Sequence, residues 1–157
     1  MRAVLQITEK SRLICEERVI SDCKKGMCVL LGLEKGDSRE EADRFIDKIL
    51  KMRIFADDKG KLNLAAGDVG AHILVVSNFT LCADLSSRRP SFSGAMPFGE
   101  AKELYDYFLS EMQKEADLLT GEESKVQVFP GVFGGDMKVE ITGDGPVTIW
   151  MDSEGIR

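Results

Sequence analysis

Three polar residues, Ser77, Asn78 and Thr80, follow a short apolar run in the middle of the chain, and their side chains could bind or activate a substrate. The run from His72 to Val76 is rich in branched residues, which is typical of a strand buried on both faces. Such a strand would present the polar groups at its carboxyl end. The alternative interpretation is a strand that simply runs into a polar loop.

A serine nucleophile with a histidine base does not fit this stretch. His72 is the one histidine of the chain, and it precedes Ser77 by five positions, which is roughly 17 Å of extended strand. Serines farther along the chain could still fold near His72, which we otherwise interpret as a residue at a strand start. Cys82 lies close to the polar group, but no histidine is placed to activate it, so we assign it a packing role.

The surrounding elements are predicted from periodicity. The segments 2–7 and 13–20 are expected to form a hairpin, and 27–33 a further buried strand. Three more strands are predicted near the other end, at 126–129, 137–142 and 147–151.

Two helices are predicted between these strands. Ser38 and Glu41 have the spacing of a capping box, and apolar residues then recur at helical intervals. A second apolar set with the same spacing extends from Ala101 to Met112. Residues 53–55 and 61–64 flank a turn cluster and predict a short ribbon or an irregular crossover, whereas 82–97 is expected to be an ordered surface loop with a function.

Composition restricts the class of protein. The chain has 157 residues, 43% hydrophobic and 31% charged, which predicts one globular domain. No apolar stretch approaches the ~20 residues that span a bilayer, and the first residues do not resemble a secretory signal, so we expect a cytoplasmic protein. Four cysteines without metal-ligand spacing predict free thiols and no metal site. The net charge of −6 disfavours a protein that coats nucleic acid, so any RNA contact must be local.

A second motif lies near the other end of the chain, where residues 143–148 read Gly-Asp-Gly-Pro-Val-Thr. Residues 77–81 and 143–148 resemble the two signature motifs of the D-aminoacyl-tRNA deacylase family, which usually read Ser-Gln-Phe-Thr-Leu and Asn-X-Gly-Pro-Val-Thr. Further landmarks occur in the family's order along almost the whole chain, at 1–4, 29–37, 53–55, 89–92, 104–108 and 133–139. The resemblance implies a mixed α/β fold for the single domain 1–157, of β2-(βα)2-β3 type in three α/β/β layers, assembled as a two-fold homodimer.

The resemblance also implies an activity, the hydrolysis of the ester bond of D-aminoacyl-tRNA to free tRNA and a D-amino acid, without a cofactor or a metal. Ser77, Asn78, Phe79 and Thr80 match the catalytic motif, in which main-chain N–H groups and the 2′-hydroxyl of the substrate are thought to act. Positioning the carbonyl and stabilising its oxyanion could suffice, because an aminoacyl ester already hydrolyses spontaneously. We expect Phe79 and Thr80 to supply the N–H groups and to line the pocket.

The substrate-binding residues are carried over in the same way. In the family the Gly145–Pro146 bond is cis and enters the active site of the partner subunit, where it would exclude an L side chain. Phe133, Gly135 and Met137 match the segment that helps form the adenosine pocket. The implied partners are the single-stranded 3′ end of aminoacyl-tRNA and a second copy of the chain, with no membrane involved.

Four positions depart from the family pattern. Asn78 replaces the usual Gln, Gly143 the usual Asn and Gly135 the usual Ala, while Ile7 stands where an Arg is thought to brace the Gly-Pro loop. These departures leave two alternatives open. The chain could be a relaxed deacylase of glycyl- or mischarged L-aminoacyl-tRNA, or a non-catalytic nucleic-acid-binding dimer of the same fold. A general esterase is disfavoured because the chain has no G-x-S-x-G elbow.

Overall fold

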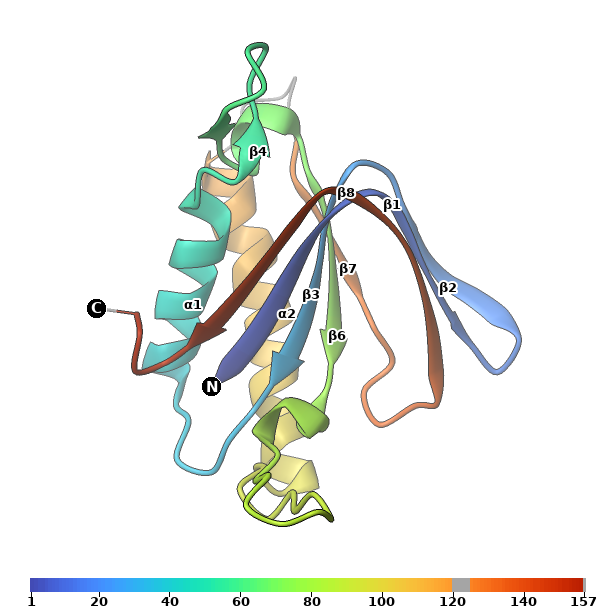
Figure 1. The fold of residues 1–157 in the computed structure, drawn as a ribbon, viewed down its shortest axis with the longest axis vertical. Coiled ribbons are helices and arrows are strands. Elements are labelled where there is room, and N and C mark those ends of the chain that lie inside the picture. The colour runs from blue at the N-terminus through green and yellow to red at the C-terminus, as the bar shows by residue number, and fades with distance from the viewer. Residues whose placement is uncertain (120–124, 157) are drawn as a thin grey trace.

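The structure is a computed structural model that describes residues 1–119 and 125–156. Its elements are, in chain order, β1 (Arg2–Cys15), β2 (Arg18–Cys23), β3 (Gly26–Gly32), α1 (Arg39–Lys51), β4 (Phe55–Ala56), β5 (Leu62–Leu64), the 3-10 turn η1 (Gly67–Val69), β6 (His72–Ser77), the 3-10 turn η2 (Phe79–Cys82), α2 (Phe98–Leu119), β7 (Gln127–Pro130) and β8 (Met137–Asp152). Figure 1 shows α1 and α2 side by side behind a curled sheet. This is a mixed α/β fold, as predicted.

The sheet has six strands and is built around β1. Antiparallel pairing joins β1 to β2, β3 and β8, whereas β3, β6 and β7 are parallel, in the order β2-β1-β3-β6-β7. The sheet curls until the Ser21 hydroxyl of β2 donates a hydrogen bond to the Pro130 carbonyl at the end of β7, over 3.0 Å. The result is a nearly closed, barrel-like sheet.

Strand β6 lies between β3 and β7, and its residues from Ile73 to Val76 are buried. This confirms the prediction of a strand covered on both faces. Gly26 allows β3 to approach β6 closely, because a Cβ at that position would lie 1.9 Å from the His72 carbonyl oxygen. Only glycine therefore fits where β3 begins.

Ser38 caps the start of helix α1, as the sequence predicts. The Ser38 hydroxyl accepts from the Glu41 N–H (3.4 Å), and the Glu41 carboxylate accepts from the Ser38 N–H (3.1 Å), which is a complete capping box. The apolar faces of both helices join the larger core, which fills the space between the helices and the sheet. A second apolar cluster lies apart from it and contains Leu13, Cys15, Cys23, Cys28, Leu74 and Val76.

The first hairpin differs from the prediction. A single 14-residue strand replaces the predicted strand 2–7 and the first part of 13–20, and the turn lies at Glu16 and Glu17. Both glutamates have positive φ, 49° and 62°, as a two-residue hairpin turn of type I′ requires. Glycine or asparagine usually occupies such positions, so the residues gave no turn signal.

The last two predicted strands, 137–142 and 147–151, are also one strand, so the described residues after α2 form two strands instead of three. In β8 the register passes from Gly143 opposite Thr8 to Thr148 opposite Gln6, so that four residues, 144–147, face Ile7 alone. The Gly-Pro segment therefore bulges out of the ladder and returns to the same partner strand. Of the two alternatives for residues 53–64, the structure forms the short ribbon, in which β4 pairs antiparallel with β5.

Two further findings concern the class of protein. All four cysteines are free and buried. Within residues 1–119 and 125–156, no helix is long and apolar enough to span a membrane.

Candidate functional site

The carboxyl end of β6 leads directly into the 3-10 turn η2, which carries the first motif. Asn78 caps this turn: its side-chain oxygen accepts from the Thr80 N–H (3.2 Å) and from the Thr80 hydroxyl (2.5 Å). The Asn78 N–H donates to the Leu31 carbonyl over 2.7 Å, which fixes the turn to the end of β3. The Thr80 N–H is thus already bound, so the Phe79 N–H is the better placed of the two to receive an oxyanion.

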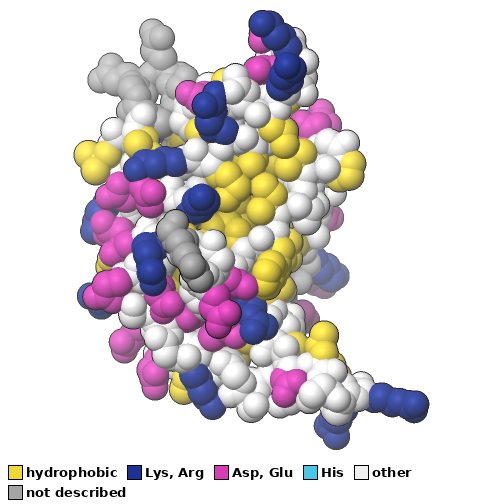
Figure 2. All heavy atoms as spheres, turned by 60° about the vertical axis from the view of Figure 1, so that its left-hand side comes forward, with side chains coloured by type: hydrophobic (Ala, Val, Ile, Leu, Met, Phe, Trp, Pro, Cys, Tyr) yellow, Lys and Arg dark blue, Asp and Glu magenta, His cyan; other side chains and the backbone are white. Residues whose placement is uncertain are grey.

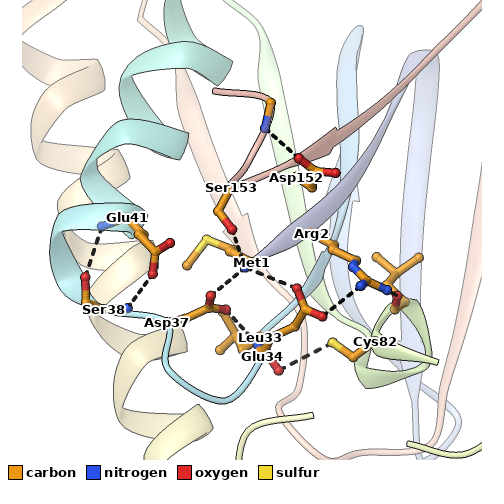
Figure 3. A network of polar contacts seen from close by, with 12 residues as sticks. Met1, Arg2, Leu33, Glu34, Asp37, Ser38, Glu41, Cys82, Asp152 and Ser153 are labelled. Carbon is orange, nitrogen blue, oxygen red and sulfur yellow. Dashed lines mark hydrogen bonds and ion pairs between the residues drawn. The ribbon is translucent and has the colours of Figure 1, made fainter. Parts of the chain in front are cut away.

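A polar network of residues at the start of β1 and just after β3 holds the turn in place. The Arg2 guanidinium donates to the Leu81 carbonyl (3.0 Å) and pairs with Glu34 (3.0 Å). The α-amino group of Met1 contacts Asp37 (2.5 Å) and Glu34 (3.4 Å), and Figure 3 shows these groups converging. A chain of charged contacts therefore connects the turn to the loop that precedes α1.

Close packing also fixes the turn against β3. A Cβ at Gly32 would lie 2.9 Å from the Leu81 Cβ and 3.1 Å from the Cys82 sulfur. The Cys82 thiol donates to the Leu33 carbonyl (3.4 Å), and burial raises its pKa to about 11. Cys82 is therefore a protonated packing residue at neutral pH, as the sequence predicted.

One cavity, of about 820 Å³, lies beside this turn. Ser77, Asn78 and Phe79 line it on one side, and the segment from Phe133 to Met137 lines it on the other. Its remaining walls come from the ends of β3 and α2, the loop before α2, and β8. The structure thus brings six of the nine predicted site residues to one cavity: Ser77, Asn78, Phe79, Phe133, Gly135 and Met137.

Thr80 is not among the residues that line this cavity, contrary to the expectation for its side chain. The side chain turns back to Asn78 instead. Gly145 and Pro146 also lie outside the cavity, exposed on the bulge of β8, and the peptide bond between them is cis.

A tyrosine supports the opposite wall of the cavity. The Tyr105 hydroxyl donates to the Val75 carbonyl (2.8 Å) and accepts from the Gly131 N–H (3.0 Å), so it joins β6 to the loop after β7. Burial raises the pKa of Tyr105 to about 12. Phe133 packs against both Tyr105 and Phe98, with ring centroids 5.4 Å and 5.1 Å away.

Gln6 is a residue that sequence reasoning missed, and it contacts the segment beside Gly145 and Pro146. Its amide donates to the carbonyls of Ile7 (2.9 Å) and Val147 (3.2 Å), and its oxygen accepts from the Thr148 hydroxyl. Gln6 therefore braces the segment that carries Gly145 and Pro146, whereas Ile7 is buried in the core. No local pattern marks Gln6, because its partners lie at the far end of the chain.

The one histidine lies away from the cavity. His72 lies at the opposite end of β6, where its ring stacks on Phe129 (4.9 Å) and its Nδ1 accepts from the Lys24 N–H (3.2 Å). In the described parts of the chain, no group of three or more His, Cys, Asp or Glu could hold a metal ion. What the site offers is backbone N–H donors, a half-buried serine and an apolar cavity with aromatic walls.

Known proteins are similar to this chain in sequence and in fold. The family model described as D-Tyr-tRNA(Tyr) deacylase matches residues 4–152. Proteins named D-aminoacyl-tRNA deacylase from Thermosipho melanesiensis and Clostridium botulinum are 41% and 44% identical over 157 and 154 residues, which is 99% and 98% of this chain and 99% and 97% of the relatives.

Two solved structures are similar in fold. The c-Myc DNA Unwinding Element Binding Protein superposes with a TM-score of 0.86 at 35% identity, covering 97% of this chain and 98% of that one. A probable eukaryotic D-amino acid tRNA deacylase superposes with a TM-score of 0.76 over 96% and 97% of the two chains, and at 15% identity it supports the fold alone.

Proposed function

The chain belongs to the D-Tyr-tRNA(Tyr) deacylase family, and we propose from this that it hydrolyses the ester bond of D-aminoacyl-tRNA, releasing tRNA and a D-amino acid. The observation that carries this proposal is the cavity in which the first motif and the 133–137 segment face each other. A terminal adenosine on the 133–137 side would place its ester near the Phe79 N–H. The enzyme would thus act in the quality control of aminoacyl-tRNA.

Catalysis would rest on positioning and on backbone dipoles. The Phe79 N–H would stabilise the oxyanion as water attacks the ester carbonyl, and the substrate's own 2′-hydroxyl would assist. Ser77 and Asn78 would shape the turn, and Thr80 would contribute its N–H once Asn78 releases it. No imidazole is needed, which agrees with the remote place of His72.

The chirality check would come from a second copy of the chain. We propose a two-fold homodimer in which Gly145 and Pro146 of one subunit enter the cavity of the other and exclude an L side chain by steric contact. The exposed bulge and the exposed apolar residues of β8, Ile141 (40%) and Trp150 (61%), support an interface here. Figure 2 shows a further hydrophobic area on one face of the molecule, flanked by charged side chains.

We also propose the domain organisation, the layers of the fold and the cellular location of the protein. Residues 1–157 would form one deacylase domain of three α/β/β layers. The protein would act in the cytoplasm, since aminoacyl-tRNA is found there and the four buried cysteines are free.

Deacylation of D-tyrosyl-, L-tyrosyl- and glycyl-tRNA by the purified protein tests the proposal, with spontaneous hydrolysis subtracted. We expect loss of the D ester, alone or with the glycyl ester. Equal loss of the L ester would show a relaxed deacylase and contradict the role of Gly145 and Pro146.

A non-catalytic nucleic-acid-binding dimer is the second candidate, favoured by the similarity to a protein described as binding a DNA unwinding element. Stable D-tyrosyl-tRNA in this assay, together with retained RNA binding, would establish that candidate instead.

A further inference from the structure

An exposed pair of phenylalanines lies at the rim of the cavity. The rings of Phe79 and Phe92 meet edge to face, with centroids 5.1 Å apart and planes at 80°. Phe79 is 59% exposed and Phe92 38% exposed, although Phe79 also lines the cavity. Single exposed apolar residues are ordinary, but two aromatic rings held together beside a cavity are a typical ligand-binding surface.

Backbone hydrogen bonds hold the loop that carries Phe92 in place. Asp84 and Ser91 exchange two backbone hydrogen bonds, of 2.8 and 3.0 Å. The loop is then tied to the residues after β3, because Lys35 donates to the Gly94 carbonyl (3.0 Å) and Met96 to the Leu33 carbonyl (2.9 Å). A ring held in this way would lose little conformational entropy on binding.

The same loop is locally basic. Residues 84–93 carry the two cations Arg88 and Arg89 and one carboxylate, that of Asp84, in a chain whose formal net charge is −6. Basic side chains project at the lower end of the molecule in Figure 2, where Figure 1 places the loop after η2. A polyanion approaching the cavity would therefore meet positive charge at this rim.

We propose that Phe79 and Phe92 form a stacking subsite for the base next to the terminal adenosine of a single-stranded RNA 3′ end, with Arg88 and Arg89 contacting its phosphates. The assignment rests on the proposed function, because an aminoacyl ester bound in the cavity requires the rest of the RNA strand to leave across the cavity rim. Aromatic stacking with a basic groove is how single strands are bound without sequence preference. The subsite thus distinguishes a tRNA end from a free aminoacyl nucleoside.

Substitution of Phe92 tests this subsite. The variants are Phe92→Leu, which removes the aromatic face but stays apolar, Phe92→Trp, which keeps a face, and Leu85→Ala as a control at a 73% exposed position of the same loop. The readout is the KM for D-tyrosyl-tRNA divided by the KM for 3′-D-tyrosyl-adenosine, which lacks the preceding nucleotides. We expect Phe92→Leu to raise this ratio about 5-fold to 150-fold. Phe92→Trp and Leu85→Ala should leave it near the wild-type value.

The salt dependence of RNA binding tests the role of the two arginines. In the double variant Arg88→Ala and Arg89→Ala, the slope of log affinity against log salt should fall by about 0.7 for each lost phosphate contact. An unchanged slope would remove the arginines from the proposal.

Several outcomes would overturn the subsite. An unchanged KM ratio in Phe92→Leu would do so, as would sedimentation showing that Phe92→Leu dissociates a dimer, since the pair would then cover a second copy of the chain. If the wild-type protein fails to hydrolyse D-tyrosyl-tRNA, the proposed function fails, but binding of the ribotrinucleotide CCA still tests the subsite. Weaker CCA binding by Phe92→Leu than by Leu85→Ala would support it, and equal binding would refute it.

Discussion

Replacing Arg2 by methionine should loosen the turn that carries Phe79 and Thr80. The guanidinium is the donor to the Leu81 carbonyl and the partner of Glu34, both at 3.0 Å, and the two side chains are 34% and 24% exposed. A hydrogen bond to a charged group contributes about 1.5–3 kcal/mol to the free energy of unfolding. Partial exposure reduces this through solvent screening, so we expect a loss of about 1–2 kcal/mol.

Arg12→Met is the matched control, because Arg12 lies on the same strand and pairs with Asp22 at 2.8 Å. That pair is 45% and 60% exposed, so solvent screening should make its loss much less costly than the loss of the Arg2 contacts. Arg2→Lys keeps the charge beside Glu34 but not the planar fork, and its stability should lie between Arg2→Met and the wild type.

Urea unfolding and deacylation kinetics provide the assay. We expect kcat for D-tyrosyl-tRNA to fall about tenfold or more in Arg2→Met, because a shift of about 1 Å in the Phe79 N–H is enough for such a loss. The KM should change less, since the cavity walls remain. Equal unfolding free energies for Arg2→Met and Arg12→Met, or full kcat in Arg2→Met, would refute the proposed role of Arg2 in holding the turn.

Three more predictions concern single side chains. Tyr105→Phe should lower the free energy of unfolding by about 1 kcal/mol, and the melting temperature by about 2–4 °C, since Gly131 and Val75 still bond each other at 2.7 Å. With the Tyr105 pKa at about 12, calorimetry at pH 6 and 8 should give the same loss, and a pH-dependent loss would contradict this. Thr80→Ala removes the hydroxyl that donates to Asn78, so it should reduce turnover by loosening the turn beside Phe79 and leave unfolding within about 0.5 kcal/mol of wild type. Wild-type turnover would show that this hydrogen bond does not position the Phe79 N–H. Burial and Lys24 lower the pKa of His72, so folding favours its neutral ring and its contribution to stability should decline as pH falls below about 6.5. His72→Gln should lose less stability than wild type between about pH 7.5 and 5.5, and equal losses would count against the shift.

Local signals in the sequence predicted the parts of the fold that local interactions determine. The capping box at Ser38 and Glu41 gave the start of α1, and the apolar run before Ser77 gave β6. The turn at Glu16 and Glu17 was missed because tertiary pairing of β1 with β2 forces positive φ on residues without that preference. The continuity of β8 was missed for a similar reason, since only its pairing with β1 keeps the two halves in one ladder.

The candidate site likewise contains residues that the sequence identified and residues that it did not. The motif residues Ser77 to Phe79 were placed because they are contiguous at a strand end, and the resemblance supplied Phe133, Gly135 and Met137. Gln6 was missed because its bond to Thr148 joins positions 142 residues apart, which no local pattern can reveal. The Thr80 side chain turns toward Asn78 and away from the cavity, a contact within the turn that the motif alone did not predict.

The pairing of β1 with β8 has a consequence for synthesis. Arg2 pairs with Asp152 in that ladder, so β1 can complete its pairing only after β8 has been synthesised (Figure 1). Until β8 is made, one edge of the 14-residue β1 has unpaired backbone groups that a second nascent chain could bind. The exposed charges of Glu9, Lys10 and Arg12 lie on this strand, and such charges disfavour edge-to-edge association. The charges of β1 thus protect the chain during the interval before its own carboxyl-terminal strand arrives.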